Sequence, residues 1–246
     1  MTGFFAGKVV IVTGIGSSNG IGRGTALMLA AQGAKLTITG TKSDALAVTK
    51  KECLAAGATE NNIHEVLGDI ALEETCKKIV EETVAKFGES DVLINNAGAL
   101  IPDKQGRLGI EQPIELFDRN MAVNVRSVII ISNLAVPHLE KTKGDIVNVS
   151  SIGAFPFIIE WAQFYCAAKA ALDQITVQMA GTLIHKGIRV NAVNPGMVVT
   201  NCANNAGIDG TELILFLADR SQSEFIIGQR YTADGGMVLK LAFENK

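Results

Sequence analysis

The sequence predicts a doubly wound α/β fold, in which helices cover both faces of a parallel sheet of about seven strands. Two features carry this prediction. First, short runs rich in Val and Ile alternate with longer segments of helical period over the whole chain, which is typical of strand–helix–strand units with right-handed crossovers. Second, the short runs are apolar at nearly every position, as expected for strands buried on both faces.

The individual elements follow from this alternation. The expected strands are 8–12, 35–39, 63–68, 91–95, 145–149, 188–193 and 225–231. Helical period is clearest in the intervening segments 21–33, 44–57, 76–88, 121–130, 164–184 and 215–220. The chain contains no internal repeat, low-complexity stretch or linker rich in Pro or Ser, so we expect residues 1–246 to form a single domain.

Composition and charge exclude several classes of protein. The chain has 246 residues, of which 48% are apolar, enough to bury a large core. Its net charge is -3, whereas nucleic-acid binding calls for a basic face. Its apolar runs are shorter than a membrane span, and the N-terminus lacks the basic and apolar regions of a signal peptide. We therefore expect a cytoplasmic protein with no nucleic-acid partner and no membrane partner.

Cysteine and histidine spacing gives no sign of a metal site. Cys53, Cys76, Cys166 and Cys202 lie far apart with no CxxC pair, so we expect free thiols in a reducing compartment. The three histidines form no cluster and are interpreted as structural residues. We therefore expect no bound metal ion.

Polar and glycine residues gather directly after six of the expected strands. They occupy positions 14–22, 40–42, 69, 95–98, 150–151 and 194–196. In an open parallel sheet, ligands bind at the carboxyl ends of the strands. The sequence therefore predicts one ligand site built from these six strand ends.

The first of these segments, TGIGSSNGIG at 13–22, joins a buried strand to a helix. Glycines there permit a tight turn and bring backbone N–H groups and the helix N-terminus close to an anion such as a pyrophosphate. The expected contacts are Gly14, Gly16, Ser17, Ser18, Asn19, Gly20, Ile21 and Gly22. The alternative is an ordinary glycine-rich turn. This interpretation is less favoured, because polar and glycine residues also follow five later strands.

Three motifs together resemble the short-chain dehydrogenase/reductase family over nearly the whole chain. They are the glycine segment at 13–22, NNAG at 95–98 and YCAAK at 165–169. The resemblance implies a Rossmann-type fold, a nicotinamide dinucleotide cofactor and a small-molecule alcohol or carbonyl substrate. The family's glycine motif is TGxxxGxG, but here five residues separate Gly14 from Gly20. Either the turn is two residues longer, or Gly16 takes the place of the first glycine and the strand end is extended.

The end of the second expected strand indicates which dinucleotide is preferred. Family members that use NAD(H) usually carry an acid there, which accepts a hydrogen bond from the ribose 2′-hydroxyl. Here the strand runs into Gly40-Thr41-Lys42 without a carboxylate. Lys42 would attract a 2′-phosphate and Thr41 would donate to it, so we predict that NADP(H) is preferred over NAD(H). The alternative is that Lys42 is an ordinary surface lysine.

The resemblance implies further cofactor contacts at the later strand ends. Asp69 resembles the family's aspartate that accepts from the adenine amino group, although an N-cap for a helix from Leu72 explains it nearly as well. The expected contacts are Asp69, Ile70, Asn96, Ala97, Gly98, Tyr165, Lys169, Pro195, Gly196, Val198 and Thr200. Within this set, the Val198 N–H and the Thr200 hydroxyl would hold the nicotinamide carboxamide.

Tyr165 and Lys169 lie four residues apart in a segment of strong helical character, so their side chains share one face. By the resemblance, Tyr165 is the general acid in reduction and the base in oxidation, while Lys169 tunes it and holds the nicotinamide ribose. A phenol has an ordinary pKa of about 10, and a nearby ammonium group would lower that pKa. The alternative is that the spacing has no functional meaning, because a Tyr and a Lys four residues apart often occur in helices by chance.

Two more residues complete the expected catalytic group. By the resemblance, the second serine of the pair Ser150 and Ser151 carries the role, so we choose Ser151, whose hydroxyl would donate to the substrate oxygen. The family uses an Asn at the place of Asn124 to hold a water linked to the lysine; the alternative is a tolerated Asn that bonds a neighbouring carbonyl in an apolar helix. Trp161 and Phe164, just before the YCAAK motif, either wall the substrate pocket or are ordinary packing residues.

The sequence also bears on oligomer formation and on the substrate lid. Alanines at 167, 168, 170 and 171 favour close helix packing, and the family commonly pairs this helix across an interface, so we expect a homodimer or homotetramer. After Thr200 the family usually has a longer segment that forms a substrate lid, but here the corresponding segment, about 201–212, is short.

The sequence therefore predicts an NADP(H)-dependent oxidoreductase that interconverts a secondary alcohol and a ketone, or reduces an aldehyde. A mostly apolar substrate is favoured by the apolar residues around Ile158, Ile159, Trp161 and Phe164. The alternative is a catalytically weak dinucleotide-binding sensor or scaffold of the same fold, which the short lid would favour because such lids exclude water from the reaction.

Overall fold

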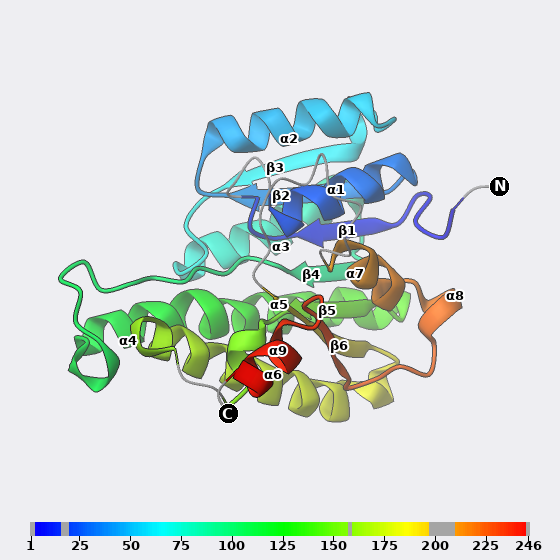
Figure 1. The fold of residues 1–246 in the computed structure, drawn as a ribbon. Coiled ribbons are helices and arrows are strands. Elements are labelled where there is room, and N and C mark those ends of the chain that lie inside the picture. Colours follow the sequence, from blue (N-terminus) through cyan, green and yellow to red (C-terminus); the bar gives the residue numbers. More distant parts are fainter. Residues whose placement is uncertain (1–2, 16–19, 157–158, 197–209, 245–246) are drawn as a thin grey trace.

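The computed structural model describes residues 3–15, 20–156, 159–196 and 210–244. Its centre is one parallel sheet with the strand order β3-β2-β1-β4-β5-β6-β7 (Figure 1). The strands are β1 Val9–Val12, β2 Lys35–Gly40, β3 Ile63–Leu67, β4 Val92–Asn95, β5 Asp145–Val149, β6 Arg189–Pro195 and β7 Arg230–Ala233. The order reverses between β1 and β4, so the predicted doubly wound α/β fold is confirmed.

Helices connect the strands and cover both faces of the sheet. The α-helices of the described residues are α1 Ile21–Ala31, α2 Ser43–Ala55, α3 Glu73–Phe87, α4 Ile114–Met121, α5 Ser127–Thr142, α6 Gln163–Leu183, α7 Thr211–Ala218, α8 Arg220–Ser223 and α9 Met237–Glu244. A π-helical stretch, Ala122–Arg126, joins α4 to α5. Such stretches occur frequently at functional sites, and this one carries Asn124.

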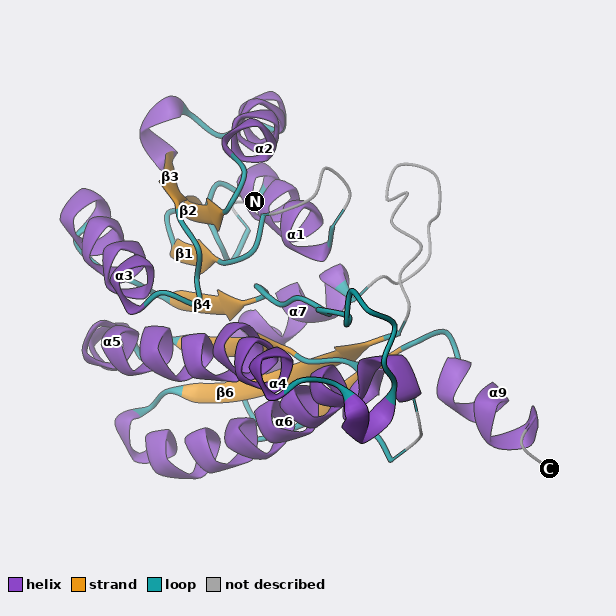
Figure 2. Cartoon of the chain, turned by 90° about the vertical axis from the view of Figure 1, so that its left-hand side faces the viewer, coloured by secondary structure: helices purple, strands orange, loops and turns teal. Residues whose placement is uncertain are grey.

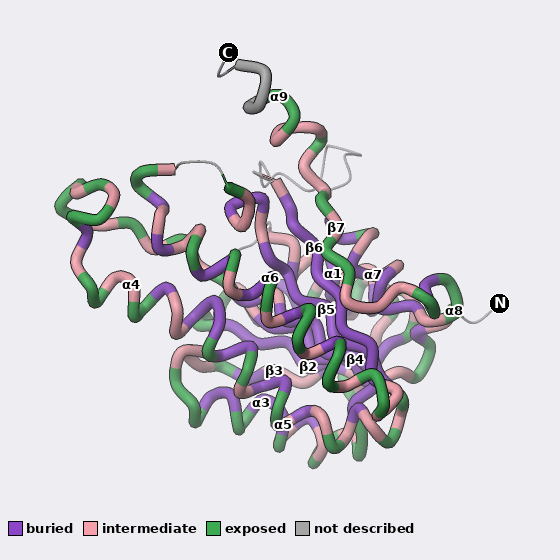
Figure 3. The backbone as a smooth tube through the Cα atoms, turned by 90° about the horizontal axis from the view of Figure 1, so that it is seen from below, coloured by how far each residue is buried: buried purple, intermediate pink, exposed green. Residues whose placement is uncertain are grey.

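The core forms because successive strand residues point to opposite faces. In β1, Val10 and Val12 belong to an apolar cluster that includes residues of α1 and α7, whereas Ile11 belongs to a second cluster with residues of α3 and α5. Figure 2 shows α1 and α7 on one side of the sheet and α3 and α5 on the other. Figure 3 shows the central strands as buried segments. Burial on both faces explains why these strands are continuous apolar runs in the sequence.

The last strand begins later than the sequence predicts. The expected strand was 225–231, whereas β7 spans Arg230–Ala233. Phe225 is 94% exposed, and Gly228 has a left-handed backbone with φ of 71°. The Asn191 side chain donates to Ile226 O at 2.8 Å and accepts from Gln229 N at 3.0 Å. The apolar run at 225–227 is therefore an irregular segment, and the two hydrogen bonds of Asn191 hold the chain around it beside β6.

Within the described residues, one helical stretch, Ile114–Thr142, is long and apolar enough to cross a membrane by length and composition alone. Half of its most apolar window is buried in this fold, and core helices of globular proteins meet the same criteria. The expected absence of a membrane partner and the cytoplasmic location stay predictions.

Candidate active site

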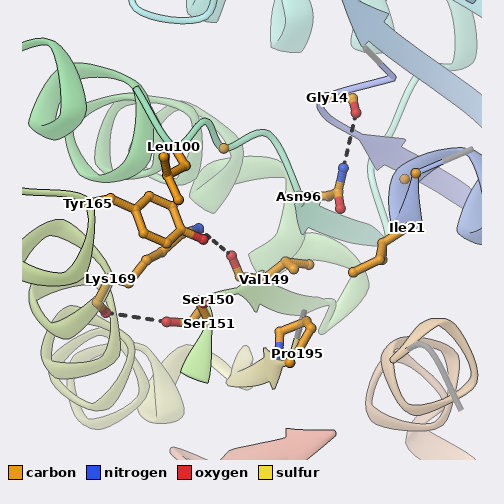
Figure 4. Close-up of a pocket in the computed structure, with 14 residues that line it drawn as sticks. Gly14, Ile21, Asn96, Leu100, Val149, Ser150, Ser151, Tyr165, Lys169 and Pro195 are labelled. Carbon is orange, nitrogen blue, oxygen red and sulfur yellow. Dashed lines mark hydrogen bonds between the residues drawn. The ribbon is translucent and has the colours of Figure 1, made fainter. Parts of the chain in front are cut away.

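The glycine turn packs tightly against the end of β4. Gly14 has φ of 81°, and a Cβ there would lie 2.5 Å from Ala97 Cα. The Asn96 amide donates to Thr13 O at 2.8 Å and to Gly14 O at 3.2 Å, and a Cβ at Gly22 would collide with the same amide (Figure 4). Only glycine fits at position 14, where φ is positive and the neighbouring atoms are backbone. β1 ends at Val12, but Ile15 N still donates to Thr39 O at 2.6 Å beyond it. The residues that would distinguish the longer turn from the extended strand, 16–19, lie outside the described residues.

Two cavities open along the carboxyl edge of the sheet. The first, of about 280 Å³, is lined by Gly14, Gly20, Ile21, Gly22, Asn96, Gly98, Leu100, Val149, Ser150, Ser151, Tyr165, Lys169, Pro195 and Gly196. The second, of about 420 Å³, is lined by Gly14, Thr39, Gly40, Thr41, Gly68, Asp69, Ile70, Ala97, Gly98, Ala99, Ile101, Arg119 and Val123. Both cavities share Gly14 and Gly98, so they meet at the reversal between β1 and β4. An extended, two-lobed molecule such as a dinucleotide fits this arrangement.

The first cavity brings together three of the four predicted catalytic residues. Tyr165 lies in the first turn of α6, and Lys169 follows one turn later on the same face. The Lys169 ammonium is buried and donates to Val149 O at 2.8 Å, as Figure 4 shows. Ser151, which follows β5, lines the cavity beside them.

The protonation of Tyr165 differs from the expectation. Burial raises the pKa of Tyr165, and this effect outweighs a hydrogen bond with Ser151 that lowers it. Lys169 Nζ points to Val149 O and lies 5.7 Å from the centre of the Tyr165 ring. Complete burial also lowers the pKa of Lys169 to about 8, although Asp173 opposes the shift. The expected lowering of the Tyr165 pKa is therefore wrong for this structure, because desolvation is the larger effect.

The two neighbouring serines make different contacts. Ser150 Oγ is buried and donates to the backbone oxygen of Lys169 at 3.3 Å, so it fixes α6 against β5. Ser151 Oγ accepts from Gly153 N at 3.0 Å and is hydrogen-bonded to the Tyr165 phenol. Of the two hydroxyls, only that of Ser151 contacts the phenol, which agrees with the choice of Ser151.

Asn124 is fully buried and holds the chain that follows β4. Its Nδ2 donates to Ala99 O and to Asn120 O, each at 2.9 Å, and its Oδ1 accepts from Ala99 N at 3.1 Å. A Cβ at Gly98 would lie 2.9 Å from Asn124 Oδ1 and 3.0 Å from Lys169 Nζ, so these two atoms flank Gly98. The contact with Asn120 O matches the alternative interpretation, an Asn that bonds a neighbouring carbonyl. Its water-holding role stays a prediction.

The end of β2 has no carboxylate and little space for one. Gly40 is the last residue of β2, and a Cβ there would lie 2.5 Å from Ile15 O. Thr41 lines the second cavity, and Lys42 follows it as an exposed residue at the start of α2. Lys42 is not among the residues that line this cavity.

Asp69 lines the second cavity but does not cap a helix. Its Oδ1 accepts from Ala71 N at 3.0 Å, and its Oδ2 accepts from Arg119 Nη2 at 2.6 Å. Helix α3 begins at Glu73, with Leu72 at its N-cap, so the alternative interpretation of Asp69 as the N-cap is wrong. Partial burial tends to raise the pKa of Asp69, but the hydrogen bonds from Ala71 and Arg119 outweigh burial and hold the pKa below its usual value.

The two aromatic residues before Tyr165 have different surroundings. Phe164 is buried and packs edge-to-face on Phe117, with ring centres 5.5 Å apart, so it is a packing residue. Trp161 is an exposed residue whose backbone oxygen accepts from Gln112 Nε2 at 3.3 Å. Neither side chain lines the two cavities described above.

Several expected contacts lie outside the described residues, and Arg119 is a charged lining residue that was not expected. Gly16, Ser17, Ser18, Asn19, Ile158, Val198 and Thr200 lie outside the described part of the chain, as do 201–209 of the expected lid. Arg119 was missed because its partner Asp69 is 50 residues away in the sequence. No local motif connects the two residues.

The buried Lys169 ammonium predicts a specific dependence of stability on pH. Its pKa is 10.5 in an exposed chain and about 8 in the fold, so between these values the unfolded chain binds more protons. The free energy of unfolding therefore rises with pH across this window. Relative to Lys169→Met, the parent chain should gain on the order of 1–2 kcal/mol between pH 7.5 and 9.5 in urea unfolding. Equal pH slopes in the two chains would contradict the burial of this charge.

Comparisons with known proteins agree with the fold. A family model described as short chain dehydrogenase matches residues 8–211. Glucose 1-dehydrogenase of Gluconobacter oxydans (strain 621H) is 35% identical over 267 residues, covering 98% of this chain and 96% of the relative. Meso-2,3-butanediol dehydrogenase of Serratia marcescens is 34% identical, covering 81% of this chain and 75% of the relative. The chain belongs to the short-chain dehydrogenase/reductase family, whose members act on alcohols and carbonyls with nicotinamide dinucleotides.

Solved structures show the same architecture. A short-chain dehydrogenase/reductase of unknown function from Caenorhabditis elegans, solved with cofactor, is 40% identical with a TM-score of 0.89, covering 96% of this chain and 97% of that chain. Glucose dehydrogenase of Caenorhabditis elegans in the apo-form is 42% identical with a TM-score of 0.85, covering 96% and 99%. An NADH-dependent reductase, A1-R′, complexed with NAD, is 29% identical with a TM-score of 0.83, covering 96% and 98%.

Proposed function

We propose that this chain is an NADP(H)-dependent oxidoreductase that interconverts a secondary alcohol and a ketone, or reduces an aldehyde. The observation that carries the proposal is the convergence of Ser151, Tyr165 and Lys169 in a cavity that shares Gly14 and Gly98 with a second cavity. One cavity thus offers proton-donating groups, and the other offers space for the remote half of a dinucleotide.

The roles of the chain's own residues follow from their protonation and placement. The bound dinucleotide supplies the hydride that reduces the carbonyl carbon. Tyr165 is neutral at pH 7, because the ordinary pKa of a phenol is about 10 and burial raises it further. Its hydroxyl can therefore donate a proton to the carbonyl oxygen, which has received the electron pair of the C=O bond. Ser151 donates a hydrogen bond to the same oxygen and stabilises its developing charge. The backbone of the glycine turn and Gly98 leave space for the dinucleotide.

The preference for NADP(H) rests on the end of β2. There Gly40 has no carboxylate that would repel a 2′-phosphate, Thr41 lines the second cavity, and the exposed Lys42 follows it in the chain. We expect NADPH to bind the parent chain more tightly than NADH in fluorescence titrations. Lys42→Ala should weaken NADPH binding about tenfold and leave NADH binding unchanged, because an exposed ion pair to phosphate is lost.

A matched control for this test is Lys51→Ala, which removes another exposed lysine from the same helix, α2. Lys51→Ala should bind both dinucleotides like the parent chain. Equal affinity of the parent chain for NADH and NADPH would overturn the proposed preference.

A homodimer or homotetramer formed through α6 is also proposed. Ala167 and Ala170 are exposed on α6, so this surface allows close approach of a second helix. Ala168, in contrast, is buried within the fold itself.

The second candidate function is a dinucleotide-binding sensor or scaffold with little turnover. It is supported by the short segment after Thr200. The alignment with the Gluconobacter relative spans 267 residues against 246 in this chain, so the relative has residues without counterparts here. A shorter lid would leave the reaction exposed to water.

An activity panel separates the two functions. NADPH oxidation would be followed with ketones, aldehydes and diketones, and NADP⁺ reduction with glucose and 2,3-butanediol, the substrates in the names of two relatives. The proposed function predicts turnover with at least one of these compounds. No turnover, with NADPH still raising the melting temperature, would favour the sensor or scaffold.

A further inference from the structure

Arg119 crosses from α4 to the end of β3 and lies at the edge of the second cavity. Its Nη2 donates to Asp69 Oδ2 at 2.6 Å, and both residues line this cavity together with Thr41 and Ala97. The ion pair is accessible from solvent, since the side chains of Arg119 and Asp69 are 46% and 35% exposed. A ligand in the cavity therefore meets a carboxylate that is already paired with a guanidinium group.

The pair leaves the Asp69 carboxylate both ionised and incompletely satisfied. Arg119 occupies Oδ2, and the Ala71 N–H occupies Oδ1 at 3.0 Å. Each carboxylate oxygen accepts two hydrogen bonds, so each of these atoms retains one further lone pair. The hydrogen bonds also hold the pKa of Asp69 below its usual value despite the opposing effect of partial burial, so the group stays an acceptor at neutral pH.

This ion pair contributes little to folding. Exposed ion pairs are worth only a fraction of the stability of a domain, because water screens the charges and the side chains lose freedom. A loss of ligand binding after removal of Arg119 would therefore not reflect unfolding. The backbone of Arg119 lies in α4, which continues directly into the π-helical stretch whose Asn124 donates to Ala99 O.

We infer that Arg119 is a positioning residue for recognition of the adenine end of the dinucleotide. It fixes the Asp69 carboxylate so that this group accepts a hydrogen bond from the exocyclic amino group of the base. A base that carries an oxygen in place of the amino group offers no donor and would bind less tightly. The inference rests on the proposed function, because it assumes that a dinucleotide occupies the second cavity.

The test compares NADPH with its deaminated analogue, in which hypoxanthine replaces adenine. Dissociation constants of both would be measured by nicotinamide fluorescence for the parent chain, Arg119→Met, Arg119→Lys and Asp69→Asn. The parent chain should prefer the adenine form roughly tenfold, as expected for one hydrogen bond to a charged group. Arg119→Met and Asp69→Asn should lose most of this preference, and Arg119→Lys should restore part of it.

The matched control is Arg126→Met. Arg126 follows Arg119 on the same continuous helical stretch and forms an exposed ion pair of the same kind, with Glu73 Oε2 at 3.1 Å, but lines neither cavity. This variant should keep the tenfold preference. An unchanged preference in Arg119→Met would overturn the inference alone. Failure of the parent chain to bind either compound would overturn the proposed function and the inference with it.

Discussion

Replacing Tyr165 with Phe is expected to lower carbonyl-dependent NADPH oxidation by about 10²–10⁴-fold, the usual contribution of a positioned general acid. The variant keeps the aromatic ring and loses only the hydroxyl that is hydrogen-bonded to Ser151. Because the ring remains in the first turn of α6, binding of NADPH should change little. Steady-state rates and NADPH titrations of the two chains provide the measurement.

Two outcomes of the same experiment would contradict the role of Tyr165 as the general acid. If Tyr165→Phe keeps more than a third of the parent rate, another group supplies the proton and the proposed role of Tyr165 is wrong. If both the rate and NADPH affinity collapse together, the hydroxyl serves to hold the dinucleotide and does not act as the acid.

Ser151→Ala and Ser150→Ala should differ in their effect on the turnover rate, although the two residues are adjacent. Ser151→Ala is expected to lower the turnover rate about 10²–10³-fold, as for the loss of one donor to a developing oxyanion. Ser150→Ala removes a hydroxyl that donates to the backbone oxygen of Lys169 and is expected to act mainly on stability. Rates at saturating NADPH and melting temperatures of both variants provide the measurement.

Equal losses of activity in the two serine variants would contradict this assignment. A larger loss in Ser150→Ala would reverse it and would indicate that the contact with Lys169 O matters more than the contact of Ser151 with the phenol.

The general architecture and the location of the site could be predicted from the sequence for physical reasons. Strands buried on both faces are apolar at nearly every residue, as in VVIV at Val9–Val12, so their boundaries are visible in the composition. Glycines are required where backbone meets backbone, and Gly14 against Ala97 is such a position. The carboxyl ends of parallel strands share one edge, so the residues that follow them line common cavities.

Features that depend on contacts between distant segments could not be predicted. The pairing of Arg119 with Asp69 joins α4 to the end of β3 and leaves no local pattern. The orientation of Lys169 toward Val149 O, and the burial that raises the Tyr165 pKa, are set by the packing of α6 on β5. The start of β7 at Arg230 depends on side-chain contacts of Asn191, which no propensity encodes.

The central claim is that this chain transfers a hydride to a carbonyl compound. The most direct measurement uses NADPH in which both hydrogens on the hydride-donating carbon are replaced by deuterium, with mass spectrometry of the alcohol formed from each compound of the carbonyl panel. We expect one deuterium on the carbinol carbon of at least one product, and no such product from Tyr165→Phe. An absence of deuterated alcohol from the whole panel, while NADPH still raises the melting temperature, would contradict hydride transfer by this chain and indicate a dinucleotide-binding protein.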